Sequence, residues 1–519
     1  MKKTVGVVVA LFFLFSISSG TFGQEASGEY HPNRVLVKFK QAPSAADLQK
    51  FSRAHQLRLE KIIPKVEAFL FGLPKAVDVK AAIKQLEASG LVEYAEPDYV
   101  RYPTYVPTDP LFGSQWDMTL MKLPLWWDLD KGSPSVVVAV LDTGIDLDHP
   151  DLVSQLWQNA DETPGDGDDD DGNGYVDDYN GYDFAGDGWL PGVGAEDPIP
   201  EDQYVGHGTH VSGTIAAAQD NGAGISGEAP GVKVMAVRVL GGLLGMGYSS
   251  DICDGLIYAT DNGASVINMS LGGTAKSLTE YNSLRYAWDR NVFIAAAAGN
   301  DGDSGNPLSY PAAYVFPMSI GATDSIDNIA SFSTHNEFVE VSAPGVTVLS
   351  TVPGGGYESA GWSGTSMATP HAAGLAALLY SMYSGIENWQ VRAMLQQGVI
   401  DRGVAGWDEY YGYGRADCEQ LLAVATPSPD VLQILTPANG SRFRTGALVA
   451  ALWNPVTSAV SYRLDVTLPS GAKKVITTNT PYYTVDPAQP LPLGTYVLRV
   501  EALSAGGSVI SYDTVTFQK

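Results

Sequence analysis

The segment that most constrains this chain is residues 361–379, where a glycine-flanked serine leads into a long apolar run. The run from Ala372 to Leu379 is apolar on nearly all sides, and a helix of that kind is buried in a large core. Ser366, at the start of this helix, would face free backbone N–H groups and the positive end of the helix dipole. Such a place can hold a developing oxyanion. On this segment alone, catalysis by Ser366 and a buried helix that merely starts with a serine cap are both open.

The first residues have the order of a secretory signal. Lys2 and Lys3 precede an apolar run from Val5 to Ile17, and small and polar residues follow up to Gly23. The apolar run is short for a membrane span, and no later segment is long and apolar enough to be one. We therefore expect residues 1–23 to be removed and the product to be secreted and extracellular, without a membrane partner.

The acidity of the chain is confined to its middle. The formal net charge is −27 over 519 residues, a length that suggests about three domains. Residues 102–428 carry 10 Lys/Arg against 43 Asp/Glu, whereas residues 24–101 carry 12 against 10 and residues 429–519 carry 7 against 5. This distribution argues against a nucleic-acid partner and favours bound cations or a high-salt habitat.

Two cysteines, Cys253 and Cys418, stand in predicted helices. A disulfide between them is possible in a secreted protein, but we expect two buried free thiols.

Two polar residues stand at positions that suit catalysis. Residues 136–141 form an apolar, largely β-branched run, typical of a parallel strand covered on both faces, and Asp142 follows it. Open α/β sheets place their sites at that end of a strand, although a lone Asp there is usually structural. His207 stands between glycines at the head of a small-residue helix. His207 and His210 could instead bind a metal, but no Glu stands between or just after them as in metalloproteases.

Two further strand-like runs end in glycine. Residues 265–270 lead to Leu271-Gly272-Gly273, and residues 292–298 lead to Gly299-Asn300. Glycines there allow another backbone to approach, as a peptide bound as an added strand requires. The alternative is that these glycines merely end their strands.

Together these motifs resemble the subtilase family of serine proteases, in which the triad runs Asp, His, Ser along the chain. The match covers residues 109 to about 425 and includes the aspartate motif 142–151, the histidine motif 206–217 and the serine motif 361–371. It implies an α/β fold with a parallel sheet flanked by helices, placed at residues 105–425, and a structural role for His210. The implied catalytic residues are Asp142, His207, Ser366 and Asn300, the last as an oxyanion donor. The implied substrate-binding residues are Ser270, Leu271, Gly272 and Gly273, which would wall the pocket for the side chain before the scissile bond.

The acidic stretch at residues 161–202 predicts calcium binding, since it holds 15 Asp/Glu and no Lys or Arg. Its residues fit positions 1, 3, 5 and 9 of an EF-type loop, with glycine at position 6 but Asn180 in place of Glu at position 12. The candidate ligands are Asp169, Asp171, Asn173 and Asp177. A solvated acidic loop is the alternative. The family resemblance also implies a second Ca²⁺ site nearer the core, with Asp109, Asp151 and Asn221 as ligands.

The segment before the catalytic region, residues 24–104, predicts a small α+β unit. Strand patterns at 35–40, 68–71 and 91–94 alternate with helical patterns at 44–55 and 77–86. It resembles the inhibitor-type propeptides of subtilases, which implies a folding aid and inhibitor that is cleaved off between about Val100 and Pro107. A free-standing binding module is the alternative.

After a linker at residues 426–432, five short strand patterns predict a β-sandwich at residues 433–519. Trp453 and the segment 494–496 resemble fibronectin type III domains. Tyr496 is either the corner tyrosine of such a sandwich or a plain core aromatic.

The whole pattern predicts a secreted, monomeric, calcium-stabilised serine endopeptidase that acts on proteins or peptides and is made as a self-processed precursor. The alternative is a non-catalytic secreted binding protein on a subtilase scaffold. The intact set of four catalytic residues weighs against it.

Overall fold

The computed structural model describes residues 30–74, 77–99, 105–186, 188, 194–486 and 491–519. They fall into two compact units, Met1–Tyr102 and Pro103–Lys519. The predicted signal peptide, residues 1–23, lies outside the described residues. Within the described residues, no helix combines the length and the apolar character that crossing a membrane requires.

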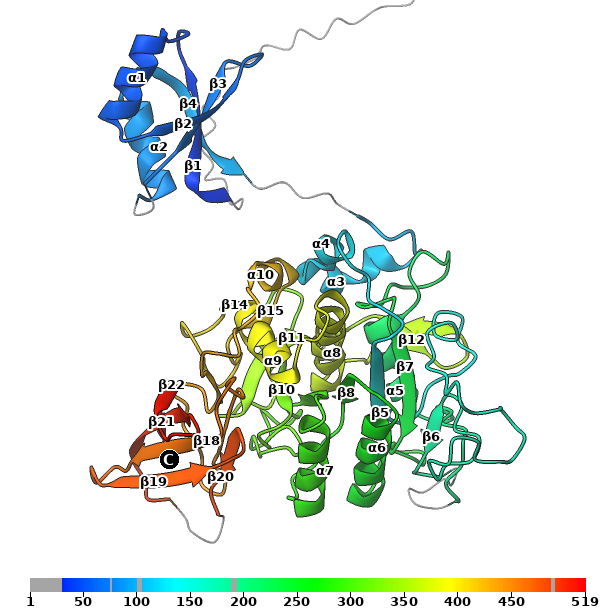
Figure 1. The fold of residues 1–519 in the computed structure, drawn as a ribbon. Helices are drawn as coiled ribbons and strands as arrows, with labels where there is room; N and C mark the ends of the chain where they lie inside the picture. Colours follow the sequence, from blue (N-terminus) through cyan, green and yellow to red (C-terminus); the bar gives the residue numbers. More distant parts are fainter. Residues whose placement is uncertain (1–29, 75–76, 100–104, 187, 189–193, 487–490) are drawn as a thin grey trace, which may run out of the picture. The chain divides into compact units, whose positions relative to one another are not determined.

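The N-terminal unit is an antiparallel sheet with strand order β2-β3-β1-β4, accompanied by two helices (Figure 1). Its buried core includes Val35, Val37, Phe71 and Leu86. The sequence predicted every element except β2. The elements are β1 (Tyr30–Phe39), α1 (Ala45–Ala54), β2 (Arg58–Ile63), β3 (Ala68–Gly72), α2 (Val79–Ala88) and β4 (Val92–Tyr99).

The second unit is built on a nine-stranded sheet with order β14-β15-β11-β10-β9-β8-β5-β7-β6, in which only the β14–β15 pair is antiparallel. This confirms the predicted α/β class. The strands are β5 (Val137–Asp142), β6 (Gly181–Asp183), β7 (Lys233–Arg238), β8 (Val266–Met269), β9 (Phe293–Ala297), β10 (Met318–Thr323), β11 (Val339–Pro344), β14 (Val399–Ile400) and β15 (Arg415–Ala416). A separate hairpin pairs β12 (Ser350–Val352) with β13 (Gly356–Glu358).

Helices cover both faces of this sheet, as the side chains of β5 show. Val137, Ala139 and Leu141 enter one hydrophobic core with α6 and α7, while Val138 and Val140 enter the other with α5 and α8. This alternation explains why β5 is apolar at every position before Asp142. The helices are η1 (Phe112–Ser114), α3 (Trp116–Leu120), α4 (Leu123–Trp127), α5 (His207–Ala216), α6 (Ser249–Asp261), α7 (Leu278–Trp288), α8 (Thr365–Met382), α9 (Asn388–Gln397) and α10 (Cys418–Ala423).

Helix α8 is the predicted buried helix, and its run from Ala372 to Leu379 is wholly buried. The helix begins at Thr365 with Gly364 as its cap, so Ser366 is its second residue and not its N-cap. The interpretation of Ser366 as a mere cap is therefore wrong. Its backbone N–H is instead one of the four that an α-helix leaves without an internal partner.

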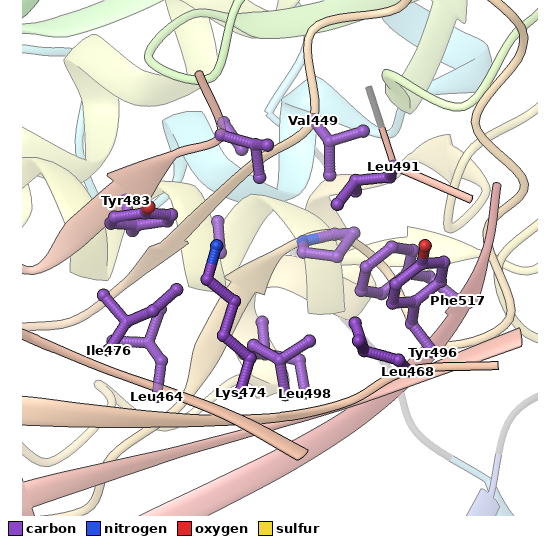
Figure 2. A pocket seen from close by; sticks show the side chains of 15 residues that line it. Val449, Leu464, Leu468, Lys474, Ile476, Tyr483, Leu491, Tyr496, Leu498 and Phe517 are labelled. Carbon is purple, nitrogen blue, oxygen red and sulfur yellow. The ribbon is translucent and has the colours of Figure 1, made fainter. Parts of the chain in front are cut away.

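The C-terminal strands form the predicted all-β sandwich, with three strands in one sheet and four in the other. Tyr496 is buried and its hydroxyl donates to the Pro492 carbonyl at 2.6 Å, which is the geometry of a corner tyrosine. Side chains of both sheets line a space of about 60 Å³. Figure 2 shows them, Leu464 and Tyr483 among them. The strands are β16 (Ile434–Thr436), β17 (Ala450–Trp453) and β20 (Tyr482–Thr484) opposite β19 (Lys473–Thr478), β18 (Ser461–Thr467), β21 (Thr495–Leu503) and β22 (Val509–Gln518).

The sandwich shares a hydrophobic core with the α6 and α7 face of the parallel sheet. Phe316 meets Tyr482 with ring centroids 5.2 Å apart, and Phe338 meets Phe443 at 5.7 Å. The Arg444 guanidinium reaches across to Glu337 at 3.1 Å and to the carbonyl of Asn306 at 2.6 Å. The two sheets of the sandwich and the parallel sheet are therefore parts of one compact unit.

Cys253 and Cys418 are both free and buried, as predicted. Burial raises the pKa of each thiol.

Candidate active site

His207 of α5 and Ser366 of α8 line one cleft, and Asp142, at the end of β5, is buried beside His207. His207 Nδ1 donates to the fully buried Asp142 Oδ1 at 2.7 Å. Gly208 must be glycine, because a Cβ there would lie 2.1 Å from the Gly144 carbonyl oxygen. The small residues around His207 therefore allow α5 to pack directly on the end of β5.

The surroundings of His207 favour its charged form on balance. Burial lowers its pKa, but the charge of Asp142, the hydrogen bond to Asp142 and the more distant charge of Asp202 together raise it further, so the net shift is upward. The ring keeps 21% of its side-chain surface exposed, toward the cleft. The bond to Asp142 thus orients the imidazole, and the side of the ring that faces the cleft stays accessible.

The Ser366 hydroxyl donates to the Ser270 carbonyl oxygen at 3.1 Å. The Ser270 hydroxyl in turn donates to the Ser366 carbonyl at 2.9 Å. These two bonds attach the first turn of α8 to the end of β8. Hydrogen bonds between a nucleophile and its base often form fully only when substrate is bound. A Ser366 hydroxyl that bonds to the Ser270 carbonyl therefore suits an enzyme without substrate.

Asn300 is oriented by Thr365, a residue that the sequence analysis did not single out. The Thr365 backbone N–H donates to Asn300 Oδ1 at 2.8 Å, and the Thr365 hydroxyl donates to the same oxygen at 3.0 Å. Because a backbone N–H can only donate, the contacted atom is the carbonyl oxygen, and the Nδ2 group remains available as a donor. Thr365 also accepts from the Gly299 N–H at 3.1 Å. The one sequence signal for this role was its place beside Ser366.

The predicted substrate wall lines a cleft of about 670 Å³ together with His207, Asn300 and Ser366. This space is far larger than the one inside the sandwich. Gly273 exchanges two backbone hydrogen bonds with Tyr310, at 2.9 and 2.8 Å, which joins the two sides of the pocket. A Cβ at Gly272 would lie 2.4 Å from Ser309 Oγ, so close packing explains that glycine. The predicted residues of the wall are Ser270, Leu271, Gly272 and Gly273.

His210 has a structural role. Its Nε2 lies 3.1 Å from the Val348 carbonyl and its ring stacks on Trp362, with centroids 4.4 Å apart. Burial lowers its pKa to about 3, so the ring is neutral. His210 and His207 therefore bond to different partners and do not form a shared metal site.

The acidic loop does not bring its four predicted ligands together. Asp169 accepts from the backbone N–H groups of residues 172, 173 and 174, and Asp177 accepts from those of residues 165, 166 and 167. Asn173 donates to Asp171 and Asp178 at 3.1 Å each. Among the described residues, the acidic side chains that do converge are Glu162, Asp171 and Asp178, each with an oxygen within 4.8 Å of the others.

The three residues of the second predicted Ca²⁺ site lie near one another. Asn221 Nδ2 donates to Asp151 Oδ1 at 2.6 Å. Asp109 is buried, and its Oδ1 has no hydrogen-bond partner within the described part of the chain. Burial, and to a lesser degree the charges of Asp220 and Asp151, raises the pKa of Asp109. A buried oxygen without a partner is costly and fits a cation.

Comparison with known proteins identifies the family of this chain. Residues 133–414 match the Subtilase family, and residues 17–98 match the Fervidolysin N-terminal prodomain. The thermophilic serine proteinase of Bacillus sp. (strain AK1) is 37% identical over 389 residues, covering 75% of this chain and 86% of that protein. Thermitase from Thermoactinomyces vulgaris is 36% identical over 324 residues, covering 61% of this chain and 99% of that protein.

The fold has a counterpart in the crystal structure of fervidolysin from Fervidobacterium pennivorans, a keratinolytic enzyme related to subtilisin. The TM-score is 0.53 at 24% identity, with 96% of this chain and 77% of that chain covered. At this identity the likeness concerns the fold alone. The family matches and the relatives together show that this chain belongs to the subtilase family and is a subtilisin-like serine endopeptidase with an N-terminal prodomain.

Proposed function

We propose that Asp142, His207 and Ser366 are the catalytic triad of this endopeptidase and that Asn300 is its oxyanion donor. The observation that carries this proposal is the 2.7 Å bond from the His207 imidazole to the buried Asp142 carboxylate, at the edge of the cleft that Ser366 lines. A carboxylate in this position fixes the tautomer of the imidazole and stabilises the imidazolium.

In the proposed reaction, Ser366 Oγ attacks the peptide carbonyl while His207 Nε2 takes the hydroxyl proton. The oxyanion of the tetrahedral intermediate accepts from Asn300 Nδ2 and from the Ser366 backbone N–H. His207 then gives its proton to the leaving amine, which leaves an acyl group on Ser366. A water molecule, activated by the same imidazole, hydrolyses this acyl-enzyme.

The substrate is an extended peptide that pairs with the wall at residues 270–273 and places the side chain before the scissile bond in the adjoining pocket. Support comes from Gly273, where the space beside the backbone is open and a peptide backbone could lie close. A serine-reactive phosphonate probe tests catalysis by Ser366 against a non-catalytic binding role. Labelling of wild type but not of Ser366→Ala supports an active enzyme, and no labelling of either favours a binding protein.

We further propose that the protein is secreted, that residues 1–23 are its signal and residues 24–104 its propeptide, and that the mature enzyme is a monomer. Intact masses of wild type and Ser366→Ala, both produced with calcium, test the processing. Loss of residues up to roughly 100–107 by the wild type alone would show cleavage by its own serine. Retention of the segment by both folded proteins would contradict self-processing.

Calcium is the proposed cofactor, held at two places. The first is the acidic loop, where Glu162, Asp171 and Asp178 converge and the Asn173 amide contacts both aspartates. Asp169 and Asp177 hold the backbone of the same loop. The second lies nearer the core at Asp109, Asp151 and Asn221, where Asp109 Oδ1 has no partner within the described chain. Both sets are oxygen donors of the kind that calcium prefers.

A further inference from the structure

Glu280 is a buried acid in the wall of the active-site cleft. It lies in the first turn of α7, is only 4% exposed, and lines the same cavity as His207, Asn300 and Ser366. The sequence analysis gave it no role. A carboxyl group in such a place, on a surface that a peptide must cover, requires an explanation.

The sequence around Glu280 suggests a different role, which the structure does not realise. Ser277 and Glu280 have the spacing of a capping box, in which the acid reaches back to the backbone N–H of the cap residue. Here the Ser277 N–H donates to the Tyr314 hydroxyl at 2.7 Å instead. The Ser277 side chain still accepts from the Glu280 N–H at 3.2 Å. The helix is therefore capped without the Glu280 carboxyl, which is left to face the cleft.

Among the described residues, no cation compensates this acid. Within the described residues, the Glu280 carboxyl has neither a hydrogen-bond partner nor an ion pair, and the side chains that line the cleft include no lysine or arginine. The other ionisable groups near it are Cys253 of α6 and Tyr314, with His207 and Asp301 elsewhere in the cleft wall. None of these is a fixed positive charge. Burial raises the pKa of Glu280 to about 7.

We propose that Glu280 is a specificity-determining residue that selects a lysine or arginine side chain of the bound peptide, on the amino-terminal side of the scissile bond. The proposal rests on the proposed catalytic function of this cleft. A substrate cation would give the buried carboxyl the partner that the protein withholds, and an ion pair shielded from water is stronger than one on the surface. A peptide with an apolar residue at that position would leave the Glu280 carboxyl unpaired, and one with an acidic residue would be repelled by it.

The test is a set of internally quenched peptides that differ by one residue. The parent peptide has alanine at each position on the amino-terminal side except the one next to the scissile bond, and each variant carries a single lysine. The position of the best variant assigns the subsite. We expect the wild type to hydrolyse the best lysine variant with a kcat/KM about tenfold or more above that of the parent, and Glu280→Gln to lose that preference.

Two controls separate this effect from general electrostatics. Asp254→Asn removes an exposed carboxylate of α6 that does not line the cleft, and it should keep the preference. The preference of the wild type, taken as the ratio of the two kcat/KM values, should grow as pH rises through about 7, because the acid ionises there. In Glu280→Gln this ratio should not change with pH. The titration of His207 affects both kcat/KM values alike and therefore cancels from the ratio.

The outcomes are distinct. No preference for lysine at any position in the wild type, or a preference that persists in Glu280→Gln, would overturn the assignment of Glu280. Failure of the wild type to cleave any peptide would instead count against the proposed catalytic function.

Discussion

Asn300 can serve an oxyanion with only one end of its amide, because Thr365 holds the other end with two hydrogen bonds. The sequence predicted Asp142, His207, Ser366 and Asn300 because each stands in a motif of its own. Thr365 was not predicted to orient Asn300, since its partner lies 65 residues away and only the fold brings the two together. Residues that act through another residue leave a weaker local pattern than residues that act directly.

Replacing Thr365 by valine should lower kcat with little change in KM. The substitution keeps the shape but removes the hydroxyl, so the Asn300 amide loses one of its two anchors. Complete loss of such an oxyanion donor costs about 10²- to 10³-fold in kcat, and we expect Thr365→Val to fall short of this and Thr365→Ser to recover most of the loss. Steady-state kinetics on one peptide measures both constants. A raised KM with unchanged kcat would point to substrate binding instead.

The acid limb of kcat/KM should lie above the ordinary histidine pKa of about 6.5. The pKa of His207 is raised on balance, so its ring is protonated, and useless as a base, up to a higher pH than a free histidine would be. Activity is therefore lost as pH falls through this raised value. Asp142→Asn should cut kcat by about 10⁴-fold, since the imidazole then loses its orienting partner. A limb at or below the ordinary value in the wild type would contradict the assignment.

Strands and loops were predicted where their pattern is strong. The buried strand β5 was evident from its unbroken apolar run, whereas β2 was missed because its side chains are largely exposed and show no alternation. The acidic loop illustrates a second limit. Its spacing predicted ligands at alternate positions, but Asp169 and Asp177 bond to the loop backbone, and the buried Glu162 comes from before the motif. Spacing alone does not reveal which carboxylates converge on one point.

Removal of calcium should lower the melting temperature. An ion that binds only the folded state stabilises it by about 2.7 kcal/mol when free at 100 times its Kd. Asp109→Asn should reduce the difference in melting temperature between calcium and chelator, because the orphaned oxygen loses its charge. Asp430→Asn, which alters an exposed residue of the predicted linker, is the matched control. An equal melting temperature for the wild type in calcium and in chelator would refute structural calcium.

At the scale of the whole molecule, the sandwich is joined to the parallel sheet by a common core. The sequence predicted the sandwich and its strand-rich character, but not this attachment. Aromatic residues such as Phe316 and Phe338 look like ordinary core residues in the sequence, and nothing local tells which neighbour covers them. The same holds for Arg444, whose partners Asn306 and Glu337 lie more than 100 residues away.

Truncation of Phe443 should therefore destabilise the catalytic half as well as the sandwich. Phe443 packs between Phe338 and Phe517, with centroids 5.7 and 5.6 Å away. Phe443→Ala should cost about 3–5 kcal/mol, and the mature enzyme should still unfold in one transition. Calorimetry of the mature enzyme measures this, with the exposed Val475→Ala as control. Separate transitions for the two parts, with only one shifted, would contradict a common core.

The common core also bears on how such a chain can change over evolutionary time. A module joined by a loose linker can be lost, gained or exchanged by recombination without harm to its neighbour. Here, loss of the sandwich would uncover Phe316 and Phe338, along with Tyr281, whose hydroxyl bonds to Thr484. Gene fusions that replace it would have to restore that apolar surface at once. The sandwich and the protease are therefore expected to be inherited together, as a single unit of selection.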